Sequence, residues 1–176
     1  MTDIFSLKVE ELVSKIKDAQ LTSVEICEKY IERINKFEKD VNAWAYFDKK
    51  LLLEKASEAD NVRRSGKPIG PLHGIPVALK DIIGTLDMPT ECGTVIRKGK
   101  SFSQKAEIVD LLLSAGAIVM GKTATSELAY LGPSNTSNPH DYSRTPGGSS
   151  SGSAAAVASF MAPLSIGSQT GGSVIR

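Results

Sequence analysis

Two short apolar runs with a helical segment between them constrain the fold more than any other feature of the chain. Ile75-Pro-Val-Ala-Leu79 and Ala117-Ile-Val-Met120 are nearly all apolar, which is typical of strands buried on both faces. Residues 108–115 place apolar side chains on one helical face, and Gly116 predicts the end of that helix. A strand, a helix and a strand in this order predict an α/β fold with a sheet covered by helices.

The residues before these runs predict helices. Apolar side chains recur at helical spacing over residues 9–16, and Thr22 with Glu25 forms a capping box that predicts a second helix from about Ser23. The remaining expected elements are a short strand over 42–47, a helix over 52–62, a loop over 132–148, a small-residue helix over about 151–160 and a strand over about 163–168. The chain therefore reads as N-terminal helices followed by part of a mixed β-sheet.

The composition excludes several classes of protein. With 41% hydrophobic and 23% charged residues in 176, the chain is neither disordered nor collagen-like, and its length fits one domain. Its 21 basic and 20 acidic side chains give no field for attracting nucleic acid. No run approaches the roughly 18 apolar residues of a membrane helix, and the first residues do not form a secretory signal. We therefore expect a cytoplasmic protein that contacts neither nucleic acid nor membrane directly.

Cysteines and histidines do not form a metal site in the sequence. Cys27 and Cys92 follow no ligand spacing, alone or with His73 and His140. We expect two reduced structural thiols, no metal and no cofactor.

The segment Gly116-Ala-Ile-Val-Met-Gly-Lys122-Thr123 matches the phosphate-binding pattern G-x-x-x-x-G-K-[ST]. That pattern requires a strand before the first glycine and a flexible loop around the phosphate, whereas a helix precedes Gly116 here and the middle residues are strand-like. We expect a helix end, a buried strand and a loop instead, with no nucleotide site.

Two serine-containing segments are candidates for nucleophilic chemistry. Pro146-Gly-Gly-Ser149 resembles a flexible linker, but it continues directly into strong helix sequence, which a linker would not do. Gly171-Gly-Ser173 reads either as an ordinary turn or as a nucleophile whose glycines let backbone N–H groups converge on an oxyanion. Serine needs a base, and no local motif ties His73 or His140 to a serine. Lys80 directly follows an apolar run, and burial would lower its pKa far enough to make it a base.

Together these residues resemble the amidase signature family. The resemblance rests on Gly70-Pro-Leu-His-Gly-Ile-Pro-Val-Ala-Leu-Lys80-Asp, on Pro146-Gly-Gly-Ser149-Ser-Ser-Gly-Ser and on Gly171-Gly-Ser173, in that order. It implies an amidase fold and amide hydrolysis through an acyl-enzyme. It covers nearly the whole chain.

The resemblance also implies roles for individual residues. Ser173 matches the nucleophile, Lys80 the base, and Ser149 the bridging serine, which lies at a cis peptide bond in this family. The loop residues whose amides form the oxyanion hole correspond to Thr170, Gly171 and Gly172, and Ser168 matches a residue that supports the triad by hydrogen bonding.

Within the family, the sequence around Lys80 and Ser173 looks most like that of the malonamidase branch, which acts on small carboxylic amides. There the arginine that follows the nucleophile binds the substrate carboxylate, and Arg176 fits this role as a bidentate cation. The alternatives are the A subunit of a glutamyl-tRNA amidotransferase, a non-catalytic truncated fragment and, outside this family, a nucleotide-binding protein. Gln169 and the extra residue before Arg176 favour the malonamidase branch.

Members of the family run to several hundred residues. We therefore expect residues 1–176 to be the N-terminal part of a single domain, truncated just after the nucleophile motif. We expect a small amide substrate, with a homodimer or a complementing C-terminal chain as partner. A frayed end near Ser173 would misplace the oxyanion donors, so we also expect the chain alone to hydrolyse amides poorly.

Overall fold

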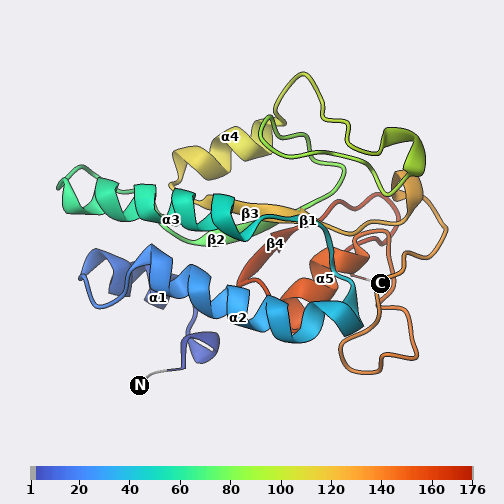
Figure 1. Ribbon diagram of the computed structural model, residues 1–176, viewed down its shortest axis with the longest axis horizontal. Coiled ribbons are helices and arrows are strands. Elements are labelled where there is room, and N and C mark those ends of the chain that lie inside the picture. The colour runs from blue at the N-terminus through green and yellow to red at the C-terminus, as the bar shows by residue number, and fades with distance from the viewer. Residues whose placement is uncertain (1–2, 176) are drawn as a thin grey trace.

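A computed structural model describes residues 3–175 and shows helices packed around a small sheet (Figure 1). The α-helices are α1 (Val9–Lys17), α2 (Ser23–Val41), α3 (Lys49–Arg64), α4 (Glu107–Ser114) and α5 (Ser151–Ala158). The strands are β1 (Trp44–Phe47), β2 (Pro76–Lys80), β3 (Ile118–Thr123) and β4 (Leu164–Ile166). Three short 3₁₀ segments, which the sequence did not predict, are η1 (Ile4–Ser6), η2 (Val95–Arg97) and η3 (Glu127–Ala129).

The four strands form one mixed sheet in the order β1-β3-β2-β4. β2 pairs in parallel with both β3 and β4, whereas β1 pairs antiparallel with β3. Every residue of β2 and β3 is buried, so both faces of the central strands are covered, as continuous apolar strands require. The predicted mixed α/β architecture is therefore confirmed.

The N-terminal helices begin where the capping signals place them. In α2, Thr22 and Glu25 form the predicted capping box, each side chain binding the other residue's backbone N–H. A buried carboxylate of α3, Asp60, also accepts hydrogen bonds from the N–H groups of Ser23 and Val24 at 2.8 and 3.2 Å. This contact satisfies two more donors at the helix start and ties α2 to α3, which run side by side in Figure 1.

Two predicted boundaries were wrong, each for a physical reason. The first strand begins at Trp44 and not at Asn42, because Asn42 adopts a left-handed conformation (φ 54°) that ends α2. β3 does not end in a loop after Met120 but continues to Thr123, because Lys122 and Thr123 find polar partners inside the protein. Residues 118–123 of the phosphate-binding pattern therefore lie in the sheet and not in a loop.

Small residues let α5, the predicted small-residue helix, approach its neighbours closely. A Cβ atom built on Gly152 would lie 2.3 Å from the carbonyl oxygen of Ala43 and 2.4 Å from the backbone nitrogen of Ala124. Only a glycine permits this backbone contact. The helix also contacts β2, β3 and β4, so it fixes its own N-terminus against the sheet.

The three parallel strands end at the same edge of the sheet. Lys80 is the last residue of β2, and β4 ends at Ile166, just before the loop that carries Ser168 and Ser173. In parallel α/β sheets this carboxyl edge is where ligands bind. The fold therefore gathers the predicted site residues at one edge.

Candidate active site

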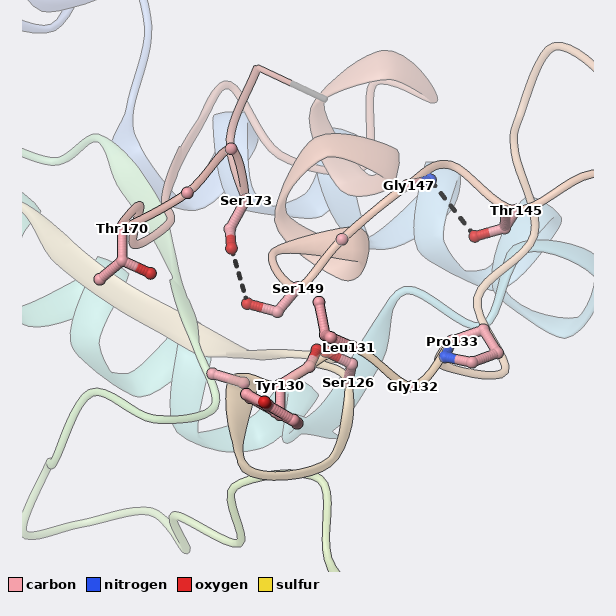
Figure 2. Close-up of a pocket in the computed structure, with 14 residues that line it drawn as sticks. Ser126, Tyr130, Leu131, Gly132, Pro133, Thr145, Gly147, Ser149, Thr170 and Ser173 are labelled. Carbon is pink, nitrogen blue, oxygen red and sulfur yellow. Dashed lines mark hydrogen bonds between the residues drawn. The ribbon is translucent and has the colours of Figure 1, made fainter.

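Lys80, Ser149 and Ser173 form a continuous chain of hydrogen bonds. Lys80 Nζ donates to Ser149 Oγ at 2.6 Å, and Ser149 Oγ donates to Ser173 Oγ at 2.9 Å. Figure 2 shows the hydroxyl of Ser173 pointing at that of Ser149. Residues from β2, from the segment just before α5 and from the loop after β4 thus converge, as the three motifs predicted.

Lys80 is fully buried and its amine has one further partner, Ser168. Lys80 Nζ donates to Ser168 Oγ at 2.9 Å, where the sequence predicted a supporting hydrogen bond. Burial lowers the pKa of Lys80 from 10.5 to about 8, because the ammonium loses its hydration. At pH 7 about a tenth of this lysine is therefore uncharged, and at pH 8 about half.

The segment before α5 presents Ser149 to the site. The peptide bond between Gly148 and Ser149 is cis, which is the geometry implied by the family resemblance. The carbonyl oxygen of Ser149 accepts a hydrogen bond from the backbone N–H of Ser126 at 3.2 Å. This hydrogen bond connects Ser149 to the segment 126–131, which contributes to the wall of the cavity described next.

A cavity of about 320 Å³ opens beside the two serines. Figure 2 shows Thr170 and Ser173 on one side of it and Tyr130 and Leu131 on the other. Its lining residues, among those that the structure describes, are Ser126, Ala129, Tyr130, Leu131, Gly132, Pro133, Thr145, Gly147, Gly148, Ser149, Thr170, Gly171, Gly172 and Ser173. None of these side chains carries a charge, so this part of the cavity suits a neutral group.

The loop predicted to hold an oxyanion lines this cavity. No residue in the described range 3–175 accepts a hydrogen bond from the N–H groups of Gly171, Gly172 or Ser173. The side chain of Gln169 instead accepts from the next two N–H groups, those of Val174 and Ile175, at 3.1 and 3.2 Å. The loop is therefore turned so that its first donors remain available. Arg176, predicted to bind a substrate carboxylate, lies outside the described residues.

Neither histidine takes part in this arrangement. The Nε2 atom of His73, a buried residue, lies 3.0 Å from the carbonyl oxygen of Ala59, and His140 is exposed in the loop after Pro139. Neither ring is hydrogen-bonded to a serine in the described chain, whereas the amine of Lys80 is.

Two polar residues that the sequence did not identify also support the site. Ser150 binds the backbone of both Ser168 and Ser173, and Ser126 has the contact with Ser149 already described. The run Ser149-Ser-Ser was visible, but sequence alone does not show which of three adjacent hydroxyls faces which neighbour.

Lys122, the lysine of the phosphate-binding pattern, belongs to a separate buried cluster. Its Nζ donates to Thr90 Oγ1 at 2.6 Å and lies 3.8 Å from a carboxylate oxygen of Asp81. Burial lowers its pKa to about 8, partly opposed by the attraction of Asp81. Since the amine points at protein groups in the interior, it is not presented to a phosphate.

Residues 3–175 contain no group of three or more metal-ligating side chains. Both cysteines are buried and free. In the same range, no helix is both long enough and apolar enough to cross a bilayer.

A protein-family model matches most of the chain. The family model named Amidase matches residues 25–176, including all three motifs described above. The chain belongs to the amidase family. Its fold is therefore that of this family.

Curated relatives resemble the chain over almost its full length. The A subunit of the glutamyl-tRNA(Gln) amidotransferase of Salinispora arenicola is 39% identical over 99% of this chain, and that of Acidothermus cellulolyticus is 40% identical over the same share. The chain spans only 37% and 36% of the length of these proteins. These relatives correspond to the alternative that ranked second from the sequence, and the malonamidase branch is not confirmed.

Solved structures of amidases share the fold. The peptide amidase of Stenotrophomonas maltophilia superposes with a TM-score of 0.90 at 36% identity, covering 97% of this chain and 37% of that one. A fatty acid amide hydrolase superposes with a TM-score of 0.88 at 30% identity, covering 97% of this chain and 31% of that one. The match extends over nearly the whole chain in both cases.

Proposed function

We propose that this chain carries the catalytic residues of an amidase that cleaves amides through a Ser-Ser-Lys triad and an acyl-enzyme. The observation that supports the proposal best is the unbroken contact from a buried lysine through Ser149 to Ser173, beside a cavity. Family membership supports the same chemistry, because the matched region includes all three residues. In this proposal Ser173 is the nucleophile, Ser149 the proton carrier and Lys80 the base.

The proton moves along the two hydrogen bonds. When Lys80 is charged it donates to Ser149, which donates to Ser173. When Lys80 is neutral its single lone pair accepts from Ser149, the direction of both bonds reverses, and Ser173 donates to Ser149. Ser168 Oγ lies within reach of a remaining N–H of the amine and keeps the lone pair aimed at Ser149. The neutral lysine is thus set to remove a proton from Ser173 through Ser149.

The reaction then has two stages, acylation of Ser173 and hydrolysis of the acyl-enzyme. Ser173 Oγ forms a bond to the amide carbon as its proton passes through Ser149 to Lys80. The C–N bond breaks when that proton returns along the same chain to the leaving nitrogen, which departs as ammonia or an amine. Water attacks the resulting ester, giving its proton to the relay, and Ser173 recovers a proton as the carboxylic acid leaves.

The loop after β4 supplies the expected electrostatic stabilisation. The N–H groups of Thr170, Gly171 and Gly172 are proposed to donate to the oxyanion, and those of Gly171 and Gly172 have no acceptor within the described range. Such donors typically contribute about 10²–10³ in rate each. No metal or cofactor is required for this chemistry.

We propose a small carboxylic amide as substrate. The described cavity wall is uncharged, so recognition of a carboxylate is assigned to Arg176, three residues after Ser173 in the sequence. The second candidate function is that of the A subunit of a glutamyl-tRNA amidotransferase, which identities of 39% and 40% favour. In that case the amidase works with a complementing chain, and ammonia passes to an acceptor.

Labelling by a fluorophosphonate, which reacts with activated serines, tests the proposed triad. The wild-type chain should be labelled on the peptide that contains Ser173, as mass spectrometry would show. Ser173→Ala should abolish labelling, and Lys80→Met should slow it by about 10²–10⁴. His73→Ala serves as the control, because the described hydrogen bond of this ring goes to Ala59 and to none of the three residues, and it should be labelled like the wild type.

Two results would contradict the triad. One is labelling that persists in Ser173→Ala, and the other is a Lys80→Met variant that reacts at the wild-type rate. Malonamate hydrolysis, compared with that of an uncharged amide of the same size, separates the two candidate functions. A preference for malonamate that Arg176→Met removes supports the small carboxylic amide, whereas ammonia release that requires a second chain supports the amidotransferase.

A further inference from the structure

Ser150 occupies the N-cap of α5, yet its hydroxyl does not cap the helix. An N-cap serine normally accepts a hydrogen bond from an N–H group in the first turn of its own helix. Ser150 does not form that bond. Because the residue is only 2% exposed, water cannot replace the missing partner, and its hydroxyl is expected to hydrogen-bond to other protein groups. These partners lie in the loop after β4.

The hydroxyl of Ser150 forms two hydrogen bonds with the backbone of one residue, Ser168. Ser150 Oγ donates to the carbonyl oxygen of Ser168 at 3.1 Å and accepts from its N–H at 3.2 Å. In addition, the N–H of Ser150 donates to the carbonyl oxygen of Ser173 at 3.2 Å. One buried residue is therefore bound to both ends of the segment from Ser168 to Ser173.

The packing around Ser150 leaves little freedom for this segment. A Cβ atom on Gly167 would lie 3.0 Å from Ser150 Oγ, so the loop backbone passes directly against the hydroxyl. Ser168 in turn accepts from Lys80, and Ser149 is the covalent neighbour of Ser150. Ser150 is thus hydrogen-bonded to Ser168 and Ser173 and adjacent to Ser149, although it has no hydrogen bond to Lys80 among the described contacts.

We propose that Ser150 is a positioning residue that holds the loop 168–173 against α5, so that Ser173 stays within reach of Ser149 and Ser168 within reach of Lys80. This inference rests on the proposed function and assigns a role to a serine outside the triad. Without the hydroxyl, both backbone groups of Ser168 lose their partner. The loop then moves away from α5, Ser173 retreats from Ser149, and water gains access to the amine of Lys80.

The control is another serine of the same helix, Ser153. Its hydroxyl, 5% exposed, lies 2.7 Å from Thr123 Oγ1 and donates to the carbonyl oxygen of Ile166 at 3.2 Å. Alanine at either position removes two buried hydrogen bonds from α5, so the two losses of stability should be comparable. Ser153, however, has no hydrogen bond to Ser168 or Ser173 among the described contacts.

The test measures fluorophosphonate labelling of the chain against pH, together with hydrogen exchange of the Ser168 amide. Ser150→Ala should lower the labelling rate about tenfold or more at pH 8, move the midpoint of the pH profile upward, and accelerate exchange at Ser168. Ser153→Ala should lower the melting temperature by a similar amount but keep the wild-type rate and midpoint. Ser150→Thr, which retains a hydroxyl, should restore labelling and slow exchange.

The same experiment separates failure of this inference from failure of the triad. Equal rates and equal midpoints in Ser150→Ala and Ser153→Ala would overturn the positioning role. If Ser173→Ala is still labelled, the triad is wrong, and exchange of the Ser168 amide alone then decides whether Ser150 holds the loop. Should Ser150→Ala not fold, Ser150→Cys gives the same comparison, since a thiol of similar size is a weaker donor and acceptor.

Discussion

The hydroxyl oxygens of Ser149 and Ser173 lie 2.9 Å apart, although 24 positions separate the two residues in the chain. Ser149 precedes α5 and Ser173 follows β4. The chain therefore runs along the helix in one direction and back along the strand, which brings Ser173 next to Ser149. Both serines come to rest beside the end of β2, where Lys80 is buried. The two serines are brought together by the fold and not by their local sequence.

We expect Ser149 to be needed for transfer of the proton and not for the fold. Ser149→Ala removes the atom that links Lys80 to Ser173, so fluorophosphonate labelling should slow by about 10²–10⁴. The double variant Lys80→Met/Ser149→Ala should be little worse than either single one, because residues that act as a unit have non-additive effects. Multiplicative losses in the double variant would show that the two residues act separately.

The pH dependence of labelling should follow the titration of Lys80. Burial lowers its pKa from 10.5 to about 8, and only the neutral amine accepts a proton. The rate should therefore rise about tenfold per pH unit below 8 and level off above it. Labelling that falls as the pH rises from 6 to 8 would contradict the assignment of Lys80 as the base.

The same shift has a consequence for stability. Because its pKa is lower in the folded state, Lys80 binds more protons in the unfolded chain between pH 8 and 10.5. The contribution of this residue to the free energy of unfolding should therefore increase with pH across that window. Comparing the pH dependence of denaturant unfolding in wild type and Lys80→Met isolates it, since the variant lacks the titrating group.

The sequence predicted the elements well where one local pattern dominates. The capping box at Thr22 fixed the start of α2, and the apolar runs before Lys80 and Lys122 identified the two central strands. These features depend on neighbouring residues alone, so they can be read without the fold. The three motifs likewise identified the serines and the lysine that the structure brings together.

What the sequence did not predict depends on contacts between distant segments. The pattern around Lys122 gave no sign that β3 would continue to Thr123, because the partners that accommodate these residues lie in other parts of the chain. The hydrogen bonds of Ser150 depend on where β4 ends relative to α5. Such pairings follow from the packed fold and from no local periodicity.

The buried contact between Lys122 and Asp81 should be important for stability. Lys122→Met leaves a carboxylate that is 2% exposed without its cation and removes the 2.6 Å hydrogen bond to Thr90. Breaking one side of such a pair costs about 3–5 kcal/mol, so the midpoint of denaturant unfolding should fall sharply. Lys122→Met/Asp81→Asn should recover part of the loss.

Binding measurements on the same protein test the expectation for the phosphate-binding pattern. Lys122 is fully buried within a strand, so titration of the wild-type chain with ATP should give no saturable signal. Saturable binding that Lys122→Met abolishes, while the protein remains folded, would show that this segment does hold a phosphate.

Gly152 should be the least tolerant position of α5. A methyl group there would lie 2.3 Å from the carbonyl oxygen of Ala43 and 2.4 Å from the nitrogen of Ala124, and both are backbone atoms that cannot turn aside. Gly152→Ala should therefore destabilise the chain by about 1–3 kcal/mol or more, despite the higher helix propensity of alanine. Since α5 begins two residues after Ser149, displacing the helix should also slow fluorophosphonate labelling. Ala154→Ser adds one heavy atom at an exposed position of the same helix and should leave both the unfolding midpoint and the labelling rate close to wild type. A Gly152→Ala variant as stable as the wild type would mean that α5 does not pack against these segments as closely as described.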